Sequence, residues 1–299
     1  MSRPPPQPIF VHHGFMGGVT SCALINKNNC NGLLVGTAAG RCELYDAETY
    51  VLIRTVYVDE EKRAISSIGA YDDDLLWVHV RNYGVLLLGS DDKIRHTLKL
   101  SHCGYCRATM IGSLLVYPDT ADEEHLLRFV LVDSGDRNRV VLKQLPLSIV
   151  SVDEVLFVGD EAGTITRISS EGKVEAEVTL FKDPVFCVAA TSVSLACGSS
   201  KSPLLLVPTA NFHGERRKID YPQSARGVGS LAFSTSGKTL LAGFWDGSIR
   251  AYSVQKLTIL VYLNLHTESI TQILWTEVNG EDRVIAASQD EKVSLWKLK

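Results

Sequence analysis

Short runs of alternating apolar and polar residues, separated by turn residues, are clearest between Arg226 and Lys299. Two passages there can be aligned with one another. Their apolar runs lie at 229–233, 238–243 and 245–252 in the first passage and at 270–275, 283–288 and 289–296 in the second. Alternation with a period of two predicts half-buried strands, and the Gly, Ser, Asp and Asn turns predict antiparallel neighbours. Each passage therefore predicts a three-stranded meander, and the run at 257–263 supplies a fourth strand.

The pattern recurs along the whole chain at a spacing of roughly 42 residues, with an aromatic residue closing the third strand of the best-formed repeats. First strands are expected to begin near Val19, Ala64, Tyr105, Leu147, Val185, Val228 and Ile270. Repeats of four short strands at this spacing are typical of β-propeller blades, which pack only on their neighbours and close into one ring. The sequence therefore predicts an all-β fold, a single seven-bladed WD-repeat β-propeller.

The two ends of the chain predict how the ring closes. Ile9–His13 forms an alternating run with no repeat before it, and the last repeat stops at Trp296, directly after its third strand. A ring leaves no open sheet edge if the N-terminal strand completes the last blade. We therefore expect residues 1–8 to form a proline-rich tail and residues 9–299 to form the propeller.

Composition narrows the class of protein. The net charge is −4 and the pI is about 6.1, which gives no bulk electrostatic reason to expect nucleic acid or an anionic membrane as a partner. The apolar runs are shorter than a membrane helix requires, and the N-terminus lacks the apolar core of a signal peptide. Seven cysteines without regular spacing fit reduced thiols. A cytoplasmic and/or nuclear protein is expected.

Four residues of the last repeat predict a buried polar network rather than a catalytic site. In a well-formed WD repeat, a turn Asp accepts a hydrogen bond from a His that precedes the first strand. That His bonds a Ser or Thr on the second strand, which in turn bonds the Trp of the third. His266, Ser288, Asp290 and Trp296 occupy these positions. Such a chain satisfies buried polar groups, and the surroundings of Ser288 lack the turn that exposes a nucleophilic serine.

Other candidate chemistry is sparse. Cys103 and Cys106 form the only Cys-x-x-Cys pair, but zinc needs two further ligands at ordered spacing, and none follows. No phosphate-binding glycine loop, dinucleotide fingerprint or kinase signature is present. We therefore expect no catalytic residue, no cofactor and no metal site, and a protein that is not an enzyme.

Candidate partner contacts fall in turns and in the segments that precede first strands. Exposed Trp and Arg are common interface hot spots, and Trp245 lies in a turn between two strands. Phe15, Tyr105, Arg107 and Arg226 fall in or beside the loops that enter the blades and are expected on the same face as Trp245. Two further segments could carry binding: an acidic insert at 119–124 between two strands, and a basic cluster at 213–218. A tolerated loop is the simpler interpretation of the acidic insert, and a solvent-facing hairpin is that of the basic cluster.

The chain resembles the WD-repeat proteins called G-protein-beta-subunit-like or ASTRA-associated. The resemblance is carried by the opening Pro6-Gln-Pro-Ile-Phe-Val11, by Gly104-Tyr-Cys-Arg107, by Trp245-Asp246 with Ile249-Arg250, by Ala286-Ala-Ser-Gln-Asp290 and by Val293-Ser-Leu-Trp296. It covers the whole chain in order, loosely in the middle.

The resemblance implies a non-enzymatic adaptor that assists maturation or assembly of phosphatidylinositol-3-kinase-related kinases. The implied protein partners are these kinase-related clients and their cochaperone complex, or a chromatin-linked ASTRA-type assembly, joined by a monomeric propeller. The alternative is a peptide-reading module, such as a ubiquitin-ligase substrate receptor or a histone reader. Ligase receptors commonly carry Trp-Asp-x-Arg at the end of a third strand, and residues 45–48 and 296–299 lack it. A propeller enzyme is the third possibility and would need titratable groups converging at the channel.

Overall fold

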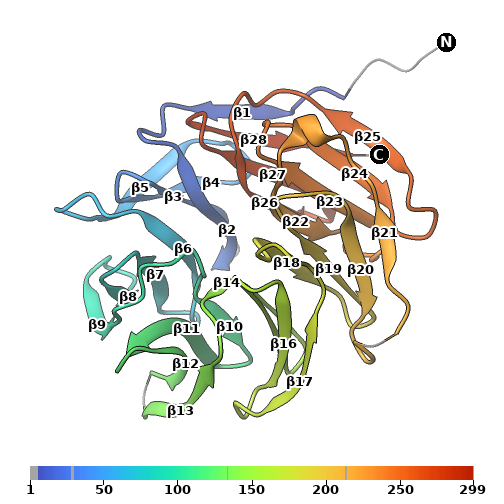
Figure 1. The fold of residues 1–299 in the computed structure, drawn as a ribbon. Coiled ribbons are helices and arrows are strands. Elements are labelled where there is room, and N and C mark those ends of the chain that lie inside the picture. The colour runs from blue at the N-terminus through green and yellow to red at the C-terminus, as the bar shows by residue number, and fades with distance from the viewer. Residues whose placement is uncertain (1–5, 28–29, 133, 213, 299) are drawn as a thin grey trace.

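Seven antiparallel sheets of four strands are arranged around a central axis in the computed structural model of the chain (Figure 1). The structure describes residues 6–27, 30–132, 134–212 and 214–298. The first strand of each blade lies nearest the axis, and the following strands lie progressively outward. The predicted seven-bladed propeller is confirmed. The first five residues of the proline-rich segment and His213 lie outside the described residues.

The strands of each blade follow one another along the chain, as in a meander. Blade one contains β2 (Val19–Lys27), β3 (Cys30–Thr37), β4 (Arg41–Asp46) and β5 (Leu52–Val58). Blade two contains β6 (Ile65–Ala70), β7 (Leu76–Val80), β8 (Gly84–Leu88) and β9 (Ile94–Lys99). Blade three contains β10 (Thr109–Ile111), β11 (Leu114–Ala121), β12 (Glu124–Leu131) and β13 (Gly135–Leu142). Blade four contains β14 (Pro146–Val152), β15 (Val155–Asp160), β16 (Thr164–Ser169) and β17 (Val174–Thr179).

The remaining blades follow the same plan. Blade five contains β18 (Cys187–Ala190), β19 (Ser194–Gly198), β20 (Leu204–Pro208) and β21 (Arg217–Ile219). Blade six contains β22 (Val228–Phe233), β23 (Thr239–Phe244), β24 (Ile249–Ser253) and β25 (Ile259–Leu263). Blade seven contains β26 (Ile270–Val278), β27 (Glu281–Ser288), β28 (Lys292–Trp296) and β1 (Phe10–His13). A 3-10 turn at Gln223–Ala225 is the one helical element of the described chain.

The N-terminal strand closes the ring as the ends of the sequence predict. β1 pairs antiparallel with β28, with Phe10 opposite Leu295 and His13 opposite Lys292. Phe10 also stacks on Tyr50 of blade one, with ring centroids 4.6 Å apart. The last blade is therefore built from both ends of the chain, and its outer strand is supplied by the N-terminal segment.

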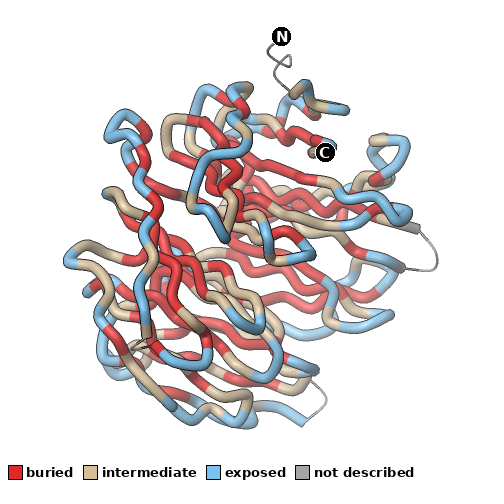
Figure 2. The backbone as a smooth tube through the Cα atoms, turned by 90° about the vertical axis from the view of Figure 1, so that its right-hand side faces the viewer, coloured by how far each residue is buried: buried red, intermediate tan, exposed pale blue. Residues whose placement is uncertain are grey.

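The apolar core lies between the blades. In the described chain, seven clusters of buried side chains each span two consecutive blades, including the cluster between blade seven and blade one. Residues of the inner strands are mostly buried, whereas exposed residues lie at turns and on outer strands such as β9 (Figure 2). Every blade thus buries both faces of its sheet against its neighbours, which explains the nearly continuous apolar runs of the inner strands.

Glycines near the ends of second strands allow the blades to approach closely. This contact recurs in four pairs: Gly36 with Ile65, Gly159 with Val185, Gly198 with Val228, and Gly243 with Ile270. A Cβ atom on Gly243 would lie 2.4 Å from Cγ2 of Ile270, a distance that no side chain tolerates. The recurring glycine therefore follows from blade-to-blade packing.

Hydrogen bonds from first strands reinforce the same contacts. Ser21 Oγ donates to the carbonyl of Ile65 at 3.2 Å, and Ser148 Oγ donates to the carbonyl of Val185 at 2.9 Å. Between blades seven and one, Thr271 Oγ1 donates to the carbonyl of Val19 at 2.7 Å. Small polar residues on the inner strands therefore connect each of these blades to the next.

One sequence prediction needs correction in this fold, and a second is made more specific. The acidic segment at 119–124 is not an inserted loop, because β11 and β12 run through it to a tight turn at Asp122 and Glu123, both with positive φ. Asp119 is buried, accepts from the backbone N–H of Ser101 at 2.8 Å and pairs with Arg128. The described part of the basic cluster likewise contributes to β21, which includes Arg217 and Lys218.

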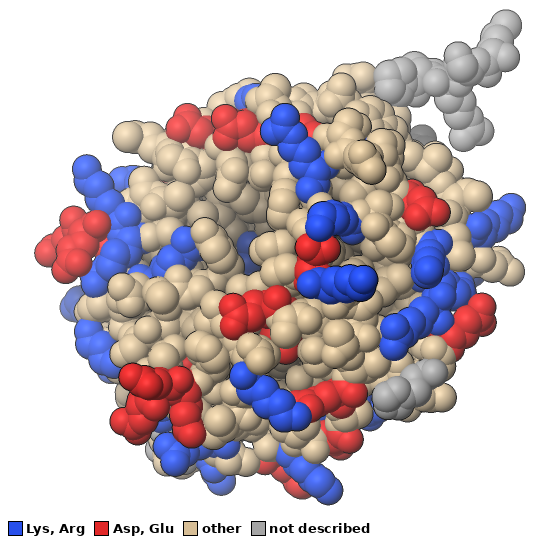
Figure 3. All heavy atoms as spheres, in the orientation of Figure 1, with Lys and Arg blue, Asp and Glu red and all other residues tan. Residues whose placement is uncertain are grey.

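Charged side chains of both signs are interspersed over the face shown in Figure 3, and the surface is hollowed at the middle of the ring. Among the described residues, no helix has the length and apolar character needed to cross a membrane.

Candidate functional site

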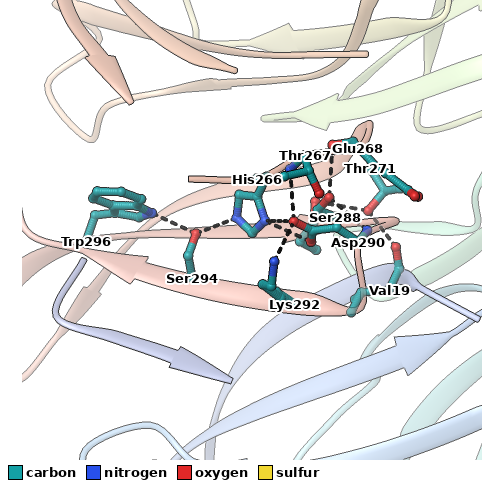
Figure 4. A network of polar contacts seen from close by, with 11 residues as sticks. Val19, His266, Thr267, Glu268, Thr271, Ser288, Asp290, Lys292, Ser294 and Trp296 are labelled. Carbon is teal, nitrogen blue, oxygen red and sulfur yellow. Dashed lines mark hydrogen bonds and ion pairs between the residues drawn. The ribbon is translucent and has the colours of Figure 1, made fainter. Parts of the chain in front are cut away.

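A buried polar network joins the segment before blade seven to the third strand of that blade (Figure 4). His266 Nδ1 lies 3.0 Å from Asp290 Oδ1, and His266 Nε2 lies 2.7 Å from Ser294 Oγ. Trp296 Nε1 donates to the same hydroxyl at 2.7 Å. A neutral imidazole that donates from Nδ1 and accepts at Nε2 satisfies all of these groups. Burial lowers the pKa of His266, which is consistent with that neutral form.

The serine of this network is Ser294, so the prediction that Ser288 forms the link is wrong. Ser288 Oγ instead donates to the carbonyl of Glu268 at 3.0 Å and accepts from the backbone N–H of Asp290 at 3.1 Å. Ser294 and Trp296 are two residues apart on one strand, and their side chains therefore point to the same face. The His266, Asp290 and Trp296 positions are found in the network as expected.

The order Asp290, His266, Ser294 has the connectivity of a hydrolytic triad, but its surroundings are unsuited to catalysis. Ser294 is fully buried, with an exposed fraction of 0%, and its oxygen already accepts a hydrogen bond from Trp296. A nucleophilic serine must reach a substrate carbonyl beside an oxyanion site. The arrangement fixes the last blade and offers no access to a substrate.

One face of the ring collects the turn after each second strand and the segment that precedes each first strand. Backbone hydrogen bonds tie the two together within a blade: Trp245 N donates to the carbonyl of Gly227 at 3.0 Å, and Arg81 N donates to that of Ala64 at 2.9 Å. Trp245, Arg226, Phe15, Tyr105 and Arg107 all belong to these segments, as the sequence predicts. We call this side of the ring the lead-in face.

A channel with a volume of about 860 Å³ lies at the middle of the ring. Its wall includes one residue from the beginning of the inner strand, or from just before it, in every blade. These residues are Thr20, Ser66, Arg107, Leu147, Phe186, Gly229 and Thr271. In five blades the residue sits at a register shift in the pairing of the first two strands, which is the signature of a β-bulge. Among the seven, only Arg107 is charged.

Arg107 crosses this channel. It precedes the inner strand of blade three, and its Nη2 donates to the carbonyls of Thr20 in blade one and Thr271 in blade seven, at 2.9 and 2.8 Å. Burial lowers the pKa of Arg107, and the nearby Arg81 acts in the same direction. The guanidinium therefore lies inside the protein, held by backbone carbonyls and beside a second positive charge.

Aromatic side chains surround the opening on the lead-in face. The guanidinium of Arg81 lies 4.7 Å from the centroid of the Tyr105 ring, and Tyr105 itself is 66% exposed. Phe186 and Trp245 meet edge to face, with centroids 5.3 Å apart, and both line the channel. Trp245 is half-buried because its ring also lies against Gly227. Tyr105 and Trp245 thus present apolar surface at one opening.

The other two partner contacts predicted from the sequence, Phe15 and Arg226, do not line the channel. Phe15 is only 3% exposed and packs beside Tyr45 and His12 between blades seven and one, so its side chain is unable to form a surface contact. Its position in a lead-in segment gave no indication of this burial. Arg226 is exposed, with a positive φ of 64°, and lies at the rim rather than in the channel wall.

Arg81 and Phe186 were not among the sequence candidates, although the repeat contains a signal that identifies Arg81. Arg81 follows the second strand of blade two directly, just as Trp245 follows that of blade six and Gln289 that of blade seven. All three line the channel. Aligning blades by this turn position would have placed Arg81 beside Trp245.

The two cysteines of the Cys-x-x-Cys pair lie in different surroundings. Cys103 is exposed, whereas Cys106 is buried and its pKa is raised by burial to about 12. The described residues contain no group of three or more His, Cys, Asp or Glu side chains placed to hold a metal ion.

Comparison with known proteins gives one family match. Residues 217–278, about a fifth of the chain, match the family described as anaphase-promoting complex subunit 4 WD40 domain. The matched segment extends from β21 through blade six to the end of β26. A search of curated proteins found no match to the chain. The family match and the seven-bladed ring together support a WD-repeat protein, a class that generally serves as protein-interaction modules without enzymatic activity.

Proposed function

We propose that this chain is a protein–protein interaction scaffold that binds its partner through the lead-in face. The observation that carries the proposal is the channel opening, where the exposed Tyr105 lies against Arg81 and the half-buried Trp245 lines the same channel. Aromatic residues and arginines are enriched among interface hot spots because they combine large apolar contact with directed hydrogen bonding. A rigid ring that gathers loops on one face suits binding without catalysis.

The finer proposal is that the partners are phosphatidylinositol-3-kinase-related kinases, their cochaperones or an ASTRA-type complex, in the cytoplasm or nucleus. Its support is the sequence resemblance, part of which falls on this face. Tyr105 and Arg107 lie in the Gly104–Arg107 motif, and Trp245 begins another of the shared motifs. The motifs that carry the resemblance are thus partly exposed at the proposed binding surface.

The matched WD40 family is named for a subunit of the anaphase-promoting complex, so membership of a stable multiprotein assembly is a natural extension of the scaffold proposal. The name of the family identifies no partner for this chain. Affinity capture should therefore identify partners without assuming them.

Affinity purification of the tagged protein at native abundance, followed by mass spectrometry, tests both the scaffold proposal and the finer proposal about its partners. Recovery of kinase-related clients or cochaperones in stoichiometric amounts is expected. Recovery of a different stable assembly would contradict the finer proposal while leaving the scaffold role intact. A protein that elutes alone at native abundance would contradict both.

A further inference from the structure

The channel carries positive charge that its wall does not neutralise. Arg81 and Arg107 both line it, and none of the described lining residues is Asp or Glu. The chain as a whole carries a net charge of −4, so the channel has the opposite sign to the rest of the protein. Coulomb interactions are strong in such a concave site because surrounding protein excludes solvent.

Neither guanidinium is paired with a carboxylate in the described structure. Arg107 bonds two backbone carbonyls through Nη2, which uses only part of its donor capacity. Arg81 stacks on Tyr105, and its buried Nε has no hydrogen-bond partner. By contrast, Arg63 and Arg128 each form an ion pair with an aspartate. Neither positive charge of the channel wall is therefore balanced by an acidic side chain of the described residues.

Three further residues of the channel wall have buried donor atoms without a partner in the described structure. Ser66 is buried, with its Oγ lacking a partner, and it lines the channel beside Arg81. The indole Nε1 atoms of Trp77 and Trp275 are also buried without partners in residues of this wall. These atoms are shielded from solvent, so the assignment of a ligand rests on the two guanidiniums.

We propose that the channel opening binds the carboxylate side chain of an acidic peptide segment presented by a protein partner, an inference that rests on the scaffold function proposed above. A carboxylate matches the planar fork of a guanidinium, and two such groups can enclose one carboxylate. Phe186 and Trp245 on the opposite wall provide apolar contact for the residues that flank the acidic side chain. A single negative charge suits a site with two guanidiniums, one of which already bonds two carbonyls.

Two pools of fluorescent nine-residue peptides test this assignment on the full chain. Both pools are randomised at every position except the centre, which is Glu in one pool and Gln in the other. The Glu pool should bind more tightly than the Gln pool and lose affinity as salt is raised, because salt screens the interaction. Arg81→Gln should weaken binding of the Glu pool by at least about tenfold, as expected for losing a hydrogen bond to a charged group.

Arg139→Gln is the matched control, since Arg139 is exposed on the outermost strand of blade three and far from the channel lining. Binding by this variant should equal that of the wild type. Equal binding of the Glu and Gln pools, or an unchanged affinity in Arg81→Gln, would overturn the proposal. Binding of inorganic phosphate is measured in parallel. Tight binding of phosphate without preference for the Glu pool would also overturn the proposal.

Failure of this inference is distinguishable from failure of the scaffold function. If Arg81→Gln captures the same protein partners as wild type and neither pool shows a preference, the scaffold remains and the acidic-peptide assignment fails. If no protein partner is captured at all, the scaffold itself is contradicted.

Discussion

Ser294 Oγ lies 2.7 Å from His266 Nε2, so the third strand of the last blade is bonded directly to the segment that leads into that blade. The same oxygen accepts from Trp296, and the imidazole continues to Asp290 in the turn. These bonds hold the turn, the lead-in segment and the third strand of one blade in a fixed arrangement. They do so beside the strand pairing by which β1 closes the ring.

Ser294→Ala is expected to destabilise the fold by about 1–3 kcal/mol, because it leaves two buried nitrogens, on His266 and Trp296, without a partner. Urea denaturation gives this change in the free energy of unfolding. Ser90→Ala is the matched control, since Ser90 is exposed in a turn. Equal stability of the two variants would show that the network contributes nothing to the fold.

Gly243→Ala tests the close contact between blades six and seven. The added methyl group would overlap Ile270 and the adjacent Ile273, both of which are held in the core, so we expect a loss of about 1–3 kcal/mol. Gly89→Ala provides the comparison, because a Cβ there meets the flexible ends of the Arg95 and Asp91 side chains, which can move. A Gly89→Ala variant that is as unstable as Gly243→Ala would contradict this explanation of the recurring glycine.

Stability is expected to fall in mild acid because several histidines are buried in the neutral form. Burial lowers the pKa of His12 and of His102 to about 4, and that of His79 to about 3, from an ordinary value of 6.5. As the pH falls below about 6.5, the unfolded chain takes up protons that the folded protein does not bind. Each histidine then lowers the free energy of unfolding by up to about 1.4 kcal/mol per pH unit, until its pKa in the folded protein is reached.

Urea denaturation between pH 7.5 and pH 5 measures this dependence. His102→Gln should reduce the slope below pH 6.5, since the amide does not titrate. A stability that stays constant between pH 6.5 and pH 5 would contradict the burial of neutral histidines.

The fold was predictable because every blade repeats a local pattern. Period-two alternation and turn residues located most strands, and the absence of a fourth strand after Trp296 led to the correct prediction that β1 completes the ring. The segment at 119–124 was misinterpreted because its charged residues resemble a loop. In the structure the burial of Asp119 is compensated by its pairing with Arg128.

The candidate site was only partly predictable. Position in a repeat indicates that a residue lies on the lead-in face, which held for Tyr105 and Trp245. It does not indicate whether a side chain turns into the seam between blades, as that of Phe15 does, or across the channel, as that of Arg107 does. The contact between Arg107 and Thr271 joins residues 164 positions apart, and such a contact depends on how the ring closes.

The most direct test of the central claim compares the proteins captured by wild type, Tyr105→Ala and Tyr262→Ala at matched abundance. Tyr105 is exposed on the lead-in face, whereas Tyr262 is exposed on an outer strand of blade six, so both variants lose a surface aromatic ring. Their unfolding in urea should show that both remain folded. The account predicts that Tyr105→Ala loses the captured partners while Tyr262→Ala retains them. Full retention by Tyr105→Ala, or equal loss in the two variants, would contradict binding through the lead-in face.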